Sequence, residues 1–260
     1  MLIDTHCHLI EDQVPADTIA GIIQRAKNAG VGTIIVPSAH PDDPRKVLAL
    51  CEQYGNLFCT LGAHPEFAGI KSDNYESLLS HTRVVGVGEI GLDYHTRDGA
   101  AIPDADRKAQ IQLFRDQLDV AKRAGLPVAV HTREAEQDTA DILCSPEYSA
   151  LGGVMHCYTS SWELAKKMLD RGFYFSASGI ITFKNSADIR DVFRRLPADR
   201  IVIETDAPYC APVPYRGKVC EPAMLPHTAR ILAETRQIPM EELENTLLEN
   251  TGRLYPKMSL

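Results

Sequence analysis

Short apolar runs that favour strands alternate along this chain with segments of helical periodicity. Helical spacing is clear at Ile111, Phe114, Leu118 and Ala121, which recur every three or four residues. The pattern repeats at roughly 32 residues per strand and helix, as expected for parallel strands joined by helical crossovers. The strand candidates are Leu2–Ile3, Thr33–Val36, Leu57–Phe58, Val84–Val87, Val128–Val130, Val154–Met155, Phe173–Phe175 and Ile201–Ile203.

Helix-end signals support this alternation. Asp43 followed by Pro44 predicts a helix start, with an end at Gly55. Ser160 and Glu163 have the spacing of a capping box, and Gly172 can supply the turn that ends the same helix. Further helical sequence follows the last unit, from about Pro239 to Asn250.

No Ser/Gly-rich linker or low-complexity stretch divides the 260 residues. We therefore predict one domain over residues 1–260, an α/β fold of the (β/α)8 or TIM-barrel type with an additional C-terminal helix. An open, doubly wound sheet is the alternative, because strand propensity does not show whether a sheet closes.

The net charge of the chain limits the kinds of partner that it can bind. Lys and Arg total 27 against 35 Asp and Glu, a net charge of −8, which argues against a broad cationic surface for duplex nucleic acid. The net negative charge is still compatible with binding of a nucleic acid end that is held by a metal ion and a few local basic residues. No apolar run reaches the ~18 residues of a membrane span, and we expect no signal peptide. Seven cysteines without a CxxC pair favour a reducing compartment, so we predict a cytoplasmic protein.

Residues that can bind metal stand at or beyond the carboxyl ends of five candidate strands. In a barrel, those ends surround a single mouth where active sites lie. Four imidazoles and two carboxylates exceed what one tetrahedral ion needs, which suggests two divalent ions bridged by a carboxylate and water. Such a pair makes hydroxide at neutral pH and suits hydrolysis of an anionic substrate. The predicted ligands are His6, His8, Glu89, His131, His156 and Asp206.

Other polar residues reach the same mouth. Asp4 and Glu204 share strand faces with His6 and Asp206, so they either hold ligand imidazoles by their second ring nitrogen or fill the barrel as inward polar residues. His64 and Arg133 are interpreted as contacts to a substrate anion, with a structural ion pair as the alternative for Arg133. In the basic loop after the last strand, Arg216 and Lys218 can hold a phosphate or remain solvated charges.

Gly86–Gly91 matches the dinucleotide-binding pattern GxGxxG. That pattern requires a helix that opens at the glycines, whereas residues 92–99 are typical of a loop. Glu89 would also bring a negative charge to the phosphates. We therefore reject a dinucleotide site.

Over essentially the whole chain, the sequence resembles the TatD family of metal-dependent hydrolases, within the amidohydrolase-like barrels. The resemblance rests on Ile3-Asp4-Thr5-His6-Cys7-His8-Leu9, Gly62-Ala63-His64-Pro65, Gly88-Glu89-Ile90-Gly91-Leu92-Asp93-Tyr94, Pro127-Val128-Ala129-Val130-His131-Thr132-Arg133, His156-Cys157-Tyr158, Gly179-Ile180-Ile181-Thr182-Phe183 and Glu204-Thr205-Asp206-Ala207-Pro208-Tyr209. It implies a TIM barrel, divalent metals on the six residues above and deoxyribonuclease activity. Some members are described as magnesium-dependent 3′–5′ exonucleases on single-stranded DNA or RNA, and others as D-aminoacyl-tRNA deacylases.

Two positions separate this chain from relatives. The family often has Asn-x-Pro where this chain has Cys220-Glu221-Pro222, a difference that bears on substrate contacts. Several amidohydrolases carry a carboxylated lysine at the end of the fourth strand, where this chain has Glu89, so its bridge is a plain carboxylate.

The resulting hypothesis is a phosphodiesterase that removes nucleotides from single-stranded DNA or RNA ends, with Mg, Mn or Zn as cofactor. Hydroxide formed at the metals attacks phosphorus, Asp206 takes or relays the proton, and Glu89 bridges the ions. The alternatives are an ester or amide hydrolase, such as an aminoacyl-tRNA deacylase, and a metal-binding interaction protein with residual activity. No obligate protein partner and no membrane contact are expected.

Overall fold

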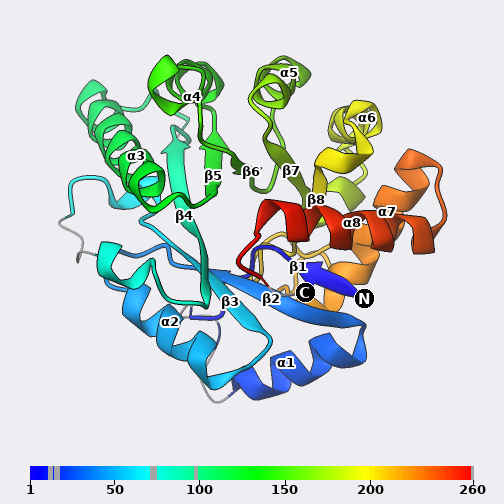
Figure 1. Cartoon of the computed structure of the whole chain (residues 1–260). Coiled ribbons are helices and arrows are strands. Elements are labelled where there is room, and N and C mark those ends of the chain that lie inside the picture. Colours follow the sequence, from blue (N-terminus) through cyan, green and yellow to red (C-terminus); the bar gives the residue numbers. More distant parts are fainter. Residues whose placement is uncertain (11–13, 15–17, 71–74, 97–98, 259–260) are drawn as a thin grey trace.

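The computed structural model describes residues 1–10, 14, 18–70, 75–96 and 99–258. Eight parallel strands lie in sequence order in one sheet, with the main helices outside them (Figure 1). The strands are β1 (Leu2–Asp4), β2 (Val31–Pro37), β3 (Leu57–Leu61), β4 (Val84–Asp93), β5 (Val128–Arg133), β6 (Gly153–Met155), β7 (Tyr174–Ala177) and β8 (Ile201–Ile203).

The helices lie outside the sheet, and the last of them lies across one of its ends (Figure 1). They are α1 (Ile19–Asn28), α2 (Pro44–Gln53), α3 (Asp104–Ala124), α4 (Glu136–Leu143), α5 (Trp162–Asp170), α6 (Ala187–Arg195), α7 (Leu225–Arg236) and α8 (Met240–Leu254). Short 3-10 helices are η2 (Pro65–Phe67), η3 (Glu76–Leu78), η4 (Pro146–Tyr148), η5 (Gly179–Thr182), η6 (Ala198–Arg200) and η7 (Pro222–Met224).

The first and last strands meet, which decides between a barrel and an open sheet. Thr5 N donates to Ile203 O at 3.1 Å, and beyond the strands Cys7 and Ala207 form a parallel bridge. The eight strands therefore form a nearly closed TIM barrel, as predicted, and the open-sheet alternative is wrong.

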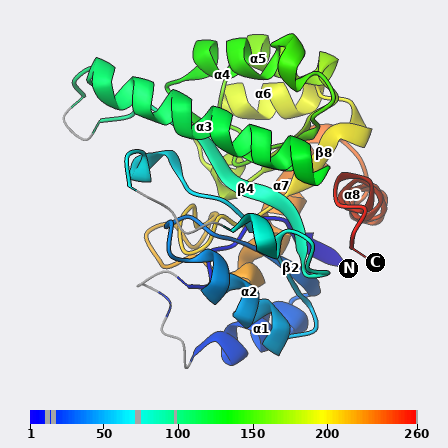
Figure 2. The same ribbon diagram turned by 60° about the vertical axis from the view of Figure 1, so that its left-hand side comes forward.

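One end of the barrel is filled by apolar side chains. Alternate strand residues point inward, and this interior layer consists of Ile3, Ile35, Val85, Ala129, Val154, Tyr174 and Val202. Leu254, Tyr255 and Met258, at and just after the end of α8, pack against that layer. The predicted C-terminal helix thus covers this end and contacts β1 there (Figures 1 and 2).

Some element boundaries differ from the sequence prediction. The cap of α5 is Ser161, not Ser160: its Oγ accepts from Leu164 N at 3.2 Å, while its own backbone N–H donates to Glu136 at 2.8 Å. Gly172 does follow α5 with a positive φ of 76°. In α2, Pro44 is the first helical residue as predicted, and the helix ends at Gln53.

β4 is longer than predicted and contains the whole glycine-rich segment. Leu92 and Asp93, expected in a loop, pair with Thr132 and Arg133 of β5. Gly91 permits this close approach, because a Cβ there would lie 2.0 Å from the carbonyl oxygen of His131. No helix opens at these glycines, since the next one, α3, begins at Asp104. The glycine-rich segment is therefore part of a strand and does not form the strand-to-helix turn of the dinucleotide-binding pattern.

Across the part of the chain that the structure describes, no helix combines the length and apolar character needed to cross a bilayer.

Candidate metal centre

The strand alternation that fills one end of the barrel with apolar side chains also directs polar side chains into the opposite end, the mouth. Ala129 and Val154 point inward, so His131 and His156, two residues further on, point inward too. Val202 is followed in the same way by Glu204, whereas Asp206 lies beyond β8 with a positive φ of 56°. Glu89 lies four residues after Val85 in β4. Glu89 and His131 lie within their strands, not after them as the sequence predicts.

His6 and His8 reach the mouth from the segment that continues β1. Main-chain hydrogen bonds hold this segment on both sides: Cys7 N donates to Ile35 O at 3.0 Å, and His8 N donates to Ala207 O at 2.7 Å. In return, Asp206 N donates to His6 O at 2.9 Å. Both imidazoles are buried.

The two oxygens of Glu89 face two different groups of ligand atoms. Oε2 lies 3.3 Å from His6 Nε2 and 3.5 Å from His8 Nε2. Asp206 Oδ1 joins this group at 3.9 Å and 3.7 Å from the same two nitrogens. We call His6, His8 and Asp206 the first ligand set.

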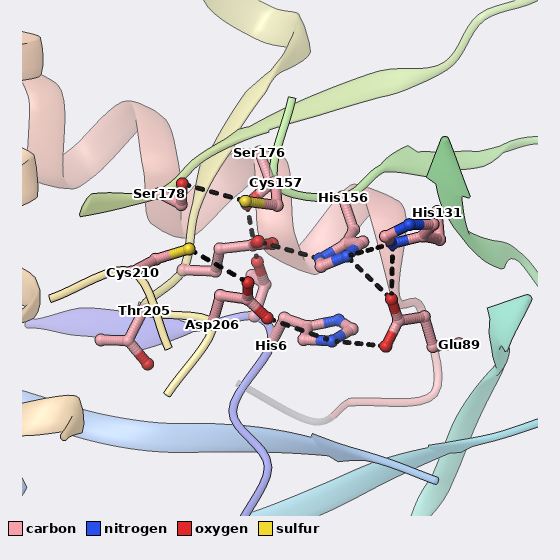
Figure 3. A network of polar contacts seen from close by, with 12 residues as sticks. His6, Glu89, His131, His156, Cys157, Ser176, Ser178, Thr205, Asp206 and Cys210 are labelled. Carbon is pink, nitrogen blue, oxygen red and sulfur yellow. Dashed lines mark hydrogen bonds and ion pairs between the residues drawn. The ribbon is translucent and has the colours of Figure 1, made fainter. Parts of the chain in front are cut away.

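Glu89 Oε1 faces the other way (Figure 3). It lies 2.9 Å from His131 Nδ1 and 3.0 Å from His156 Nε2. These two histidines form the second ligand set. His64 Nε2 lies 3.7 Å from the same oxygen, so it stands beside the second set.

The spacing of the donor atoms fits divalent cations. Ligand atoms around a tetrahedral ion at ~2.0–2.2 Å stand roughly 3.3–3.6 Å apart. His6 Nε2 and His8 Nε2 are 3.2 Å apart, and their distances to the two carboxylates run from 3.3 to 3.9 Å, within this range or slightly above it. Nitrogen and oxygen donors of this kind suit Zn, Mn or Fe, and the shared carboxylate suits a pair of ions. The residues present therefore fit the divalent metals expected from the sequence.

Burial and neighbouring charges set the protonation of His8, His64 and Glu89. Burial, with the neighbouring His6, lowers the pKa of His8 to about 3, and burial lowers that of His64 to about 4. Burial alone would raise the pKa of Glu89, but His156, His64 and a hydrogen bond from His131 outweigh it and lower the pKa. At neutral pH His8 and His64 are thus neutral and Glu89 is ionised, as ligands must be.

Carboxylates hold the outer nitrogens of the second set. Glu204 Oε1 lies 3.0 Å from His156 Nδ1, the contact predicted for Glu204. Asp93 Oδ2 lies 3.2 Å from His131 Nε2, a contact that the sequence does not reveal because residues 92–99 are typical of a loop. Such partners fix the tautomer and orientation of a ligand imidazole. The signal that could have revealed Asp93 is its place in β4 beside β5, opposite Arg133.

Asp4 does not hold an imidazole, which corrects one of the two roles considered for it. Its carboxylate accepts from Thr205 N at 2.9 Å, from Thr205 Oγ1 at 2.6 Å and from His6 N at 3.3 Å. Ile3, not Asp4, belongs to the inward layer of the barrel, and His6 lies in the segment beyond β1, so strand alternation does not put Asp4 and His6 on one inward face. Burial raises the pKa of Asp4 to about 7 despite these bonds.

A cavity of about 490 Å³ opens over both ligand sets. His64 and Arg133 line it, as do Tyr209 and Cys210 from the segment after β8. Arg133 is exposed and forms no ion pair with any residue that the structure describes, which disfavours the structural alternative. The full lining is His8, Ala39, His64, Glu66, Glu89, Asp93, His131, Thr132, Arg133, His156, Cys157, Thr159, Ile180, Asp206, Tyr209 and Cys210.

Arg216 and Lys218 do not line this cavity. The guanidinium of Arg216 lies 4.0 Å from the centre of the Phe183 ring, and Lys218 Nζ lies 5.6 Å from that of Tyr215. The structure therefore does not bring these two cations together with the candidate ligands.

Comparison with known proteins agrees with this geometry. The family described as TatD related DNase matches residues 3–256. The chain is 35% identical to the uncharacterized metal-dependent hydrolase YabD of Bacillus subtilis, over 98% of this chain and 99% of that one. It is 33% identical to the uncharacterized metal-dependent hydrolase TatD of Mycobacterium tuberculosis, over 98% and 97%. The crystal structure of the TatD homologue YjjV of Escherichia coli superposes with a TM-score of 0.87 at 33% identity, covering 98% of each chain.

Proposed function

This chain belongs to the TatD family of metal-dependent hydrolases, and we propose that it is a nuclease that removes nucleotides from single-stranded DNA or RNA ends in the 3′–5′ direction. The observation that carries the proposal is the division of Glu89 between two ligand sets. A carboxylate shared in this way is suited to two divalent ions, which we propose to be Mg, Mn or Zn. The family description as a DNase supports phosphodiester chemistry.

Each ligand set would hold one of the two ions. His6, His8 and Asp206 would hold one ion, His131 and His156 the other, and Glu89 both. When bound, the two ions lower the pKa of a coordinated water and polarise the phosphoryl group. The side chains around the cavity must accept the proton and bind the substrate.

Asp206 is the proposed proton acceptor. Burial, together with the nearby carboxylates of Glu204 and Glu89, raises its pKa above the usual value, although His156 and His6 oppose the shift. A raised pKa brings a carboxylate closer to the range that suits a general base at neutral pH. Its Oδ1 faces the first ligand set, so the proton would be accepted at the metal-facing side of the cavity.

Positively charged and hydrogen-bonding groups on the cavity wall can hold the substrate. His64 and Arg133 line the cavity, and we propose that they contact the non-bridging oxygens of a phosphate next to the second ligand set. Arg216 and Lys218 belong to the same segment after β8 as Tyr209 and stand outside the cavity. We propose that they contact phosphates further from the cleaved end.

The size of the cavity favours an unpaired end as the substrate. A volume of about 490 Å³ is typical of a small-molecule site and is far too small for a duplex. A terminal unpaired nucleotide can enter without the few kcal/mol needed to unstack and unpair a base. The seven free cysteines support the proposed cytoplasmic location, since no disulfide constrains the protein.

The experiment compares end-labelled single-stranded DNA and RNA, blunt duplex and closed circular single strands, each with added Mg²⁺ or Mn²⁺. We expect stepwise release of mononucleotides from the single strands, much slower release from the duplex and none from the circle. Glu89→Ala, purified identically, excludes contaminating nucleases, and Glu163→Gln on the exposed face of α5 is the matched control. Efficient cutting of the circle would contradict the exonuclease proposal. Absence of any nucleotide release, with hydrolysis of an aminoacyl ester, would favour the deacylase alternative.

A further inference from the structure

A second group of metal-binding atoms adjoins the first ligand set. The sulfur atoms of Cys157 and Cys210 and a carboxylate oxygen of Asp206 all lie within 4.8 Å of one another. Cys157 directly follows His156, and Cys210 lies four residues beyond Asp206. Figure 3 shows the two thiols on the side of Asp206 away from Glu89.

Asp206 connects this group to the first ligand set through its two oxygens. Oδ1 faces His6 and His8, whereas Oδ2 lies 3.4 Å from Cys210 Sγ. That spacing matches the ~3.5 Å expected between sulfur and oxygen on one tetrahedral ion with bonds of ~2.3 and ~2.0 Å. Asp206 can therefore bridge a cation in the first set and a cation held by the thiols.

The second thiol is also positioned. Cys157 Sγ lies 3.1 Å from Ser178 Oγ, which can accept the thiol hydrogen now and donate to a thiolate once that proton has left. Three of the five non-glycine residues with positive φ in the described ranges are Cys157, Asp206 and Cys210, at 42°, 56° and 55°. The fold holds all three members of the group in this uncommon conformation.

These two thiols differ from the other cysteines in their access to solvent. Both line the cavity above the ligand sets and are partly exposed. Cys7, Cys51, Cys59 and Cys220 are buried, and Cys144 is exposed but stands alone at the end of α4. A cation that enters the mouth can thus reach Cys157 and Cys210 without unfolding the chain.

We propose that Cys157, Cys210 and Asp206 form a third cation site, selective for thiophilic divalent ions such as Cd²⁺ or Zn²⁺, and that its occupation inhibits the hydrolase. Binding releases the two thiol protons to solvent and forms two metal–sulfur bonds and one metal–oxygen bond. Magnesium and manganese prefer oxygen ligands and do not compete for such sulfur atoms. The bound ion occupies Oδ2 of Asp206, draws its charge away from the first set and prevents it from accepting a proton.

The test titrates the manganese-loaded protein with Cd²⁺ in the presence of a phosphine reductant, which keeps both thiols reduced. The direct readout is the ultraviolet sulfur-to-cadmium charge-transfer absorption, which needs no substrate. We expect it to saturate at one equivalent and to disappear in Cys210→Ala. Cys144→Ala is the matched control and should behave as the unchanged protein. Cys157→Ala is a second variant, used if thermal unfolding shows that it folds.

The second readout is the Cd²⁺ concentration that halves the hydrolytic activity, with each variant referred to its own activity without Cd²⁺. Loss of one ligand should raise this concentration by at least about tenfold in Cys210→Ala. The same absorption in Cys210→Ala as in the unchanged protein would overturn the site, as would its loss only in Cys144→Ala. Equal inhibition by Cd²⁺ of Cys210→Ala and of the unchanged protein would overturn the inhibitory role of the site. Because the absorption is independent of substrate, failure of the nuclease proposal would leave this test intact.

Discussion

The first and second ligand sets are built by different means on the two sides of Glu89. His6 and His8 belong to a segment fixed by main-chain hydrogen bonds to β2 and to the segment after β8. His131 and His156 extend from strands, and their outer ring nitrogens contact the carboxylates of Asp93 and Glu204.

The two ligand sets differ in what their supporting contacts do: in the first set these contacts only position the imidazoles, and in the second set they also change the basicity of the imidazoles. Main-chain bonds place a residue but do not change the basicity of its imidazole. A carboxylate on the second ring nitrogen fixes the tautomer and raises the basicity of the ligand. Accordingly, Glu204 and Glu89 raise the pKa of His156 although burial opposes them, and Asp93 contributes to the raised pKa of His131 against the same effect of burial. We therefore expect the second set to be more sensitive to side-chain substitutions around it.

Glu89→Ala removes the one residue common to both sets and should have the largest effect. We expect turnover at saturating metal to fall by ~10²–10⁴, because both ions lose a ligand and are no longer held at a fixed separation. Folding should persist, since the apolar layer near α8 is untouched. Steady-state kinetics with a thermal unfolding control measures this, and activity within threefold of the unchanged protein would contradict a shared carboxylate.

Glu204→Gln should affect mainly the second set. The amide no longer supplies a negative charge to His156 Nδ1, so metal affinity on that side should fall by ~10–100-fold, with little change on the other. Calorimetric titration of the metal-free protein with Mn²⁺ or Zn²⁺ resolves the two affinities. Glu163→Gln serves as the control. Equal weakening of both sites would show that the two sets are not independent in the proposed way.

Thr205→Val should have the smallest effect on metal binding and act mainly on stability. It removes the hydroxyl that donates to the buried Asp4 carboxylate at 2.6 Å, while the main-chain bonds around His6 and His8 remain. We expect the free energy of unfolding to fall by about 1.5–3 kcal/mol, with metal affinity changed less than about threefold.

The same substitution has a defined pH dependence. Asp4 has a pKa of about 7 in the folded protein against an ordinary value of 3.8, so the folded state binds its proton more tightly than the unfolded state. Stability from this group therefore falls as pH rises from about 4 to 7. Loss of the hydroxyl raises the folded pKa further, so the destabilisation should increase above pH 7. Urea unfolding at pH 5 and pH 8 measures it, and a larger loss at pH 5 would contradict the assignment.

The barrel and the candidate ligands could be predicted because both depend on local alternation. Inward parity along β5 and β6 leads directly from apolar residues to His131 and His156, and Asp206 follows shortly after the end of β8. Asp93 and Asp4 could not be assigned in this way. The length of β4 depends on pairing with β5 and on the close approach at Gly91, and the orientation of Asp4 depends on where β1 ends and on Thr205, 201 residues away. The β4–β5 contacts arise only when these two strands pair, and the Asp4–Thr205 contact arises only when the sheet closes.

The most direct test of the central claim is anomalous diffraction from crystals of this protein soaked in Mn²⁺. Two ions that share Glu89 should give two anomalous peaks, one among His6, His8 and Asp206 beside Oε2, and one between His131 and His156 beside Oε1. A single peak, or two peaks that do not both contact Glu89, would contradict the account.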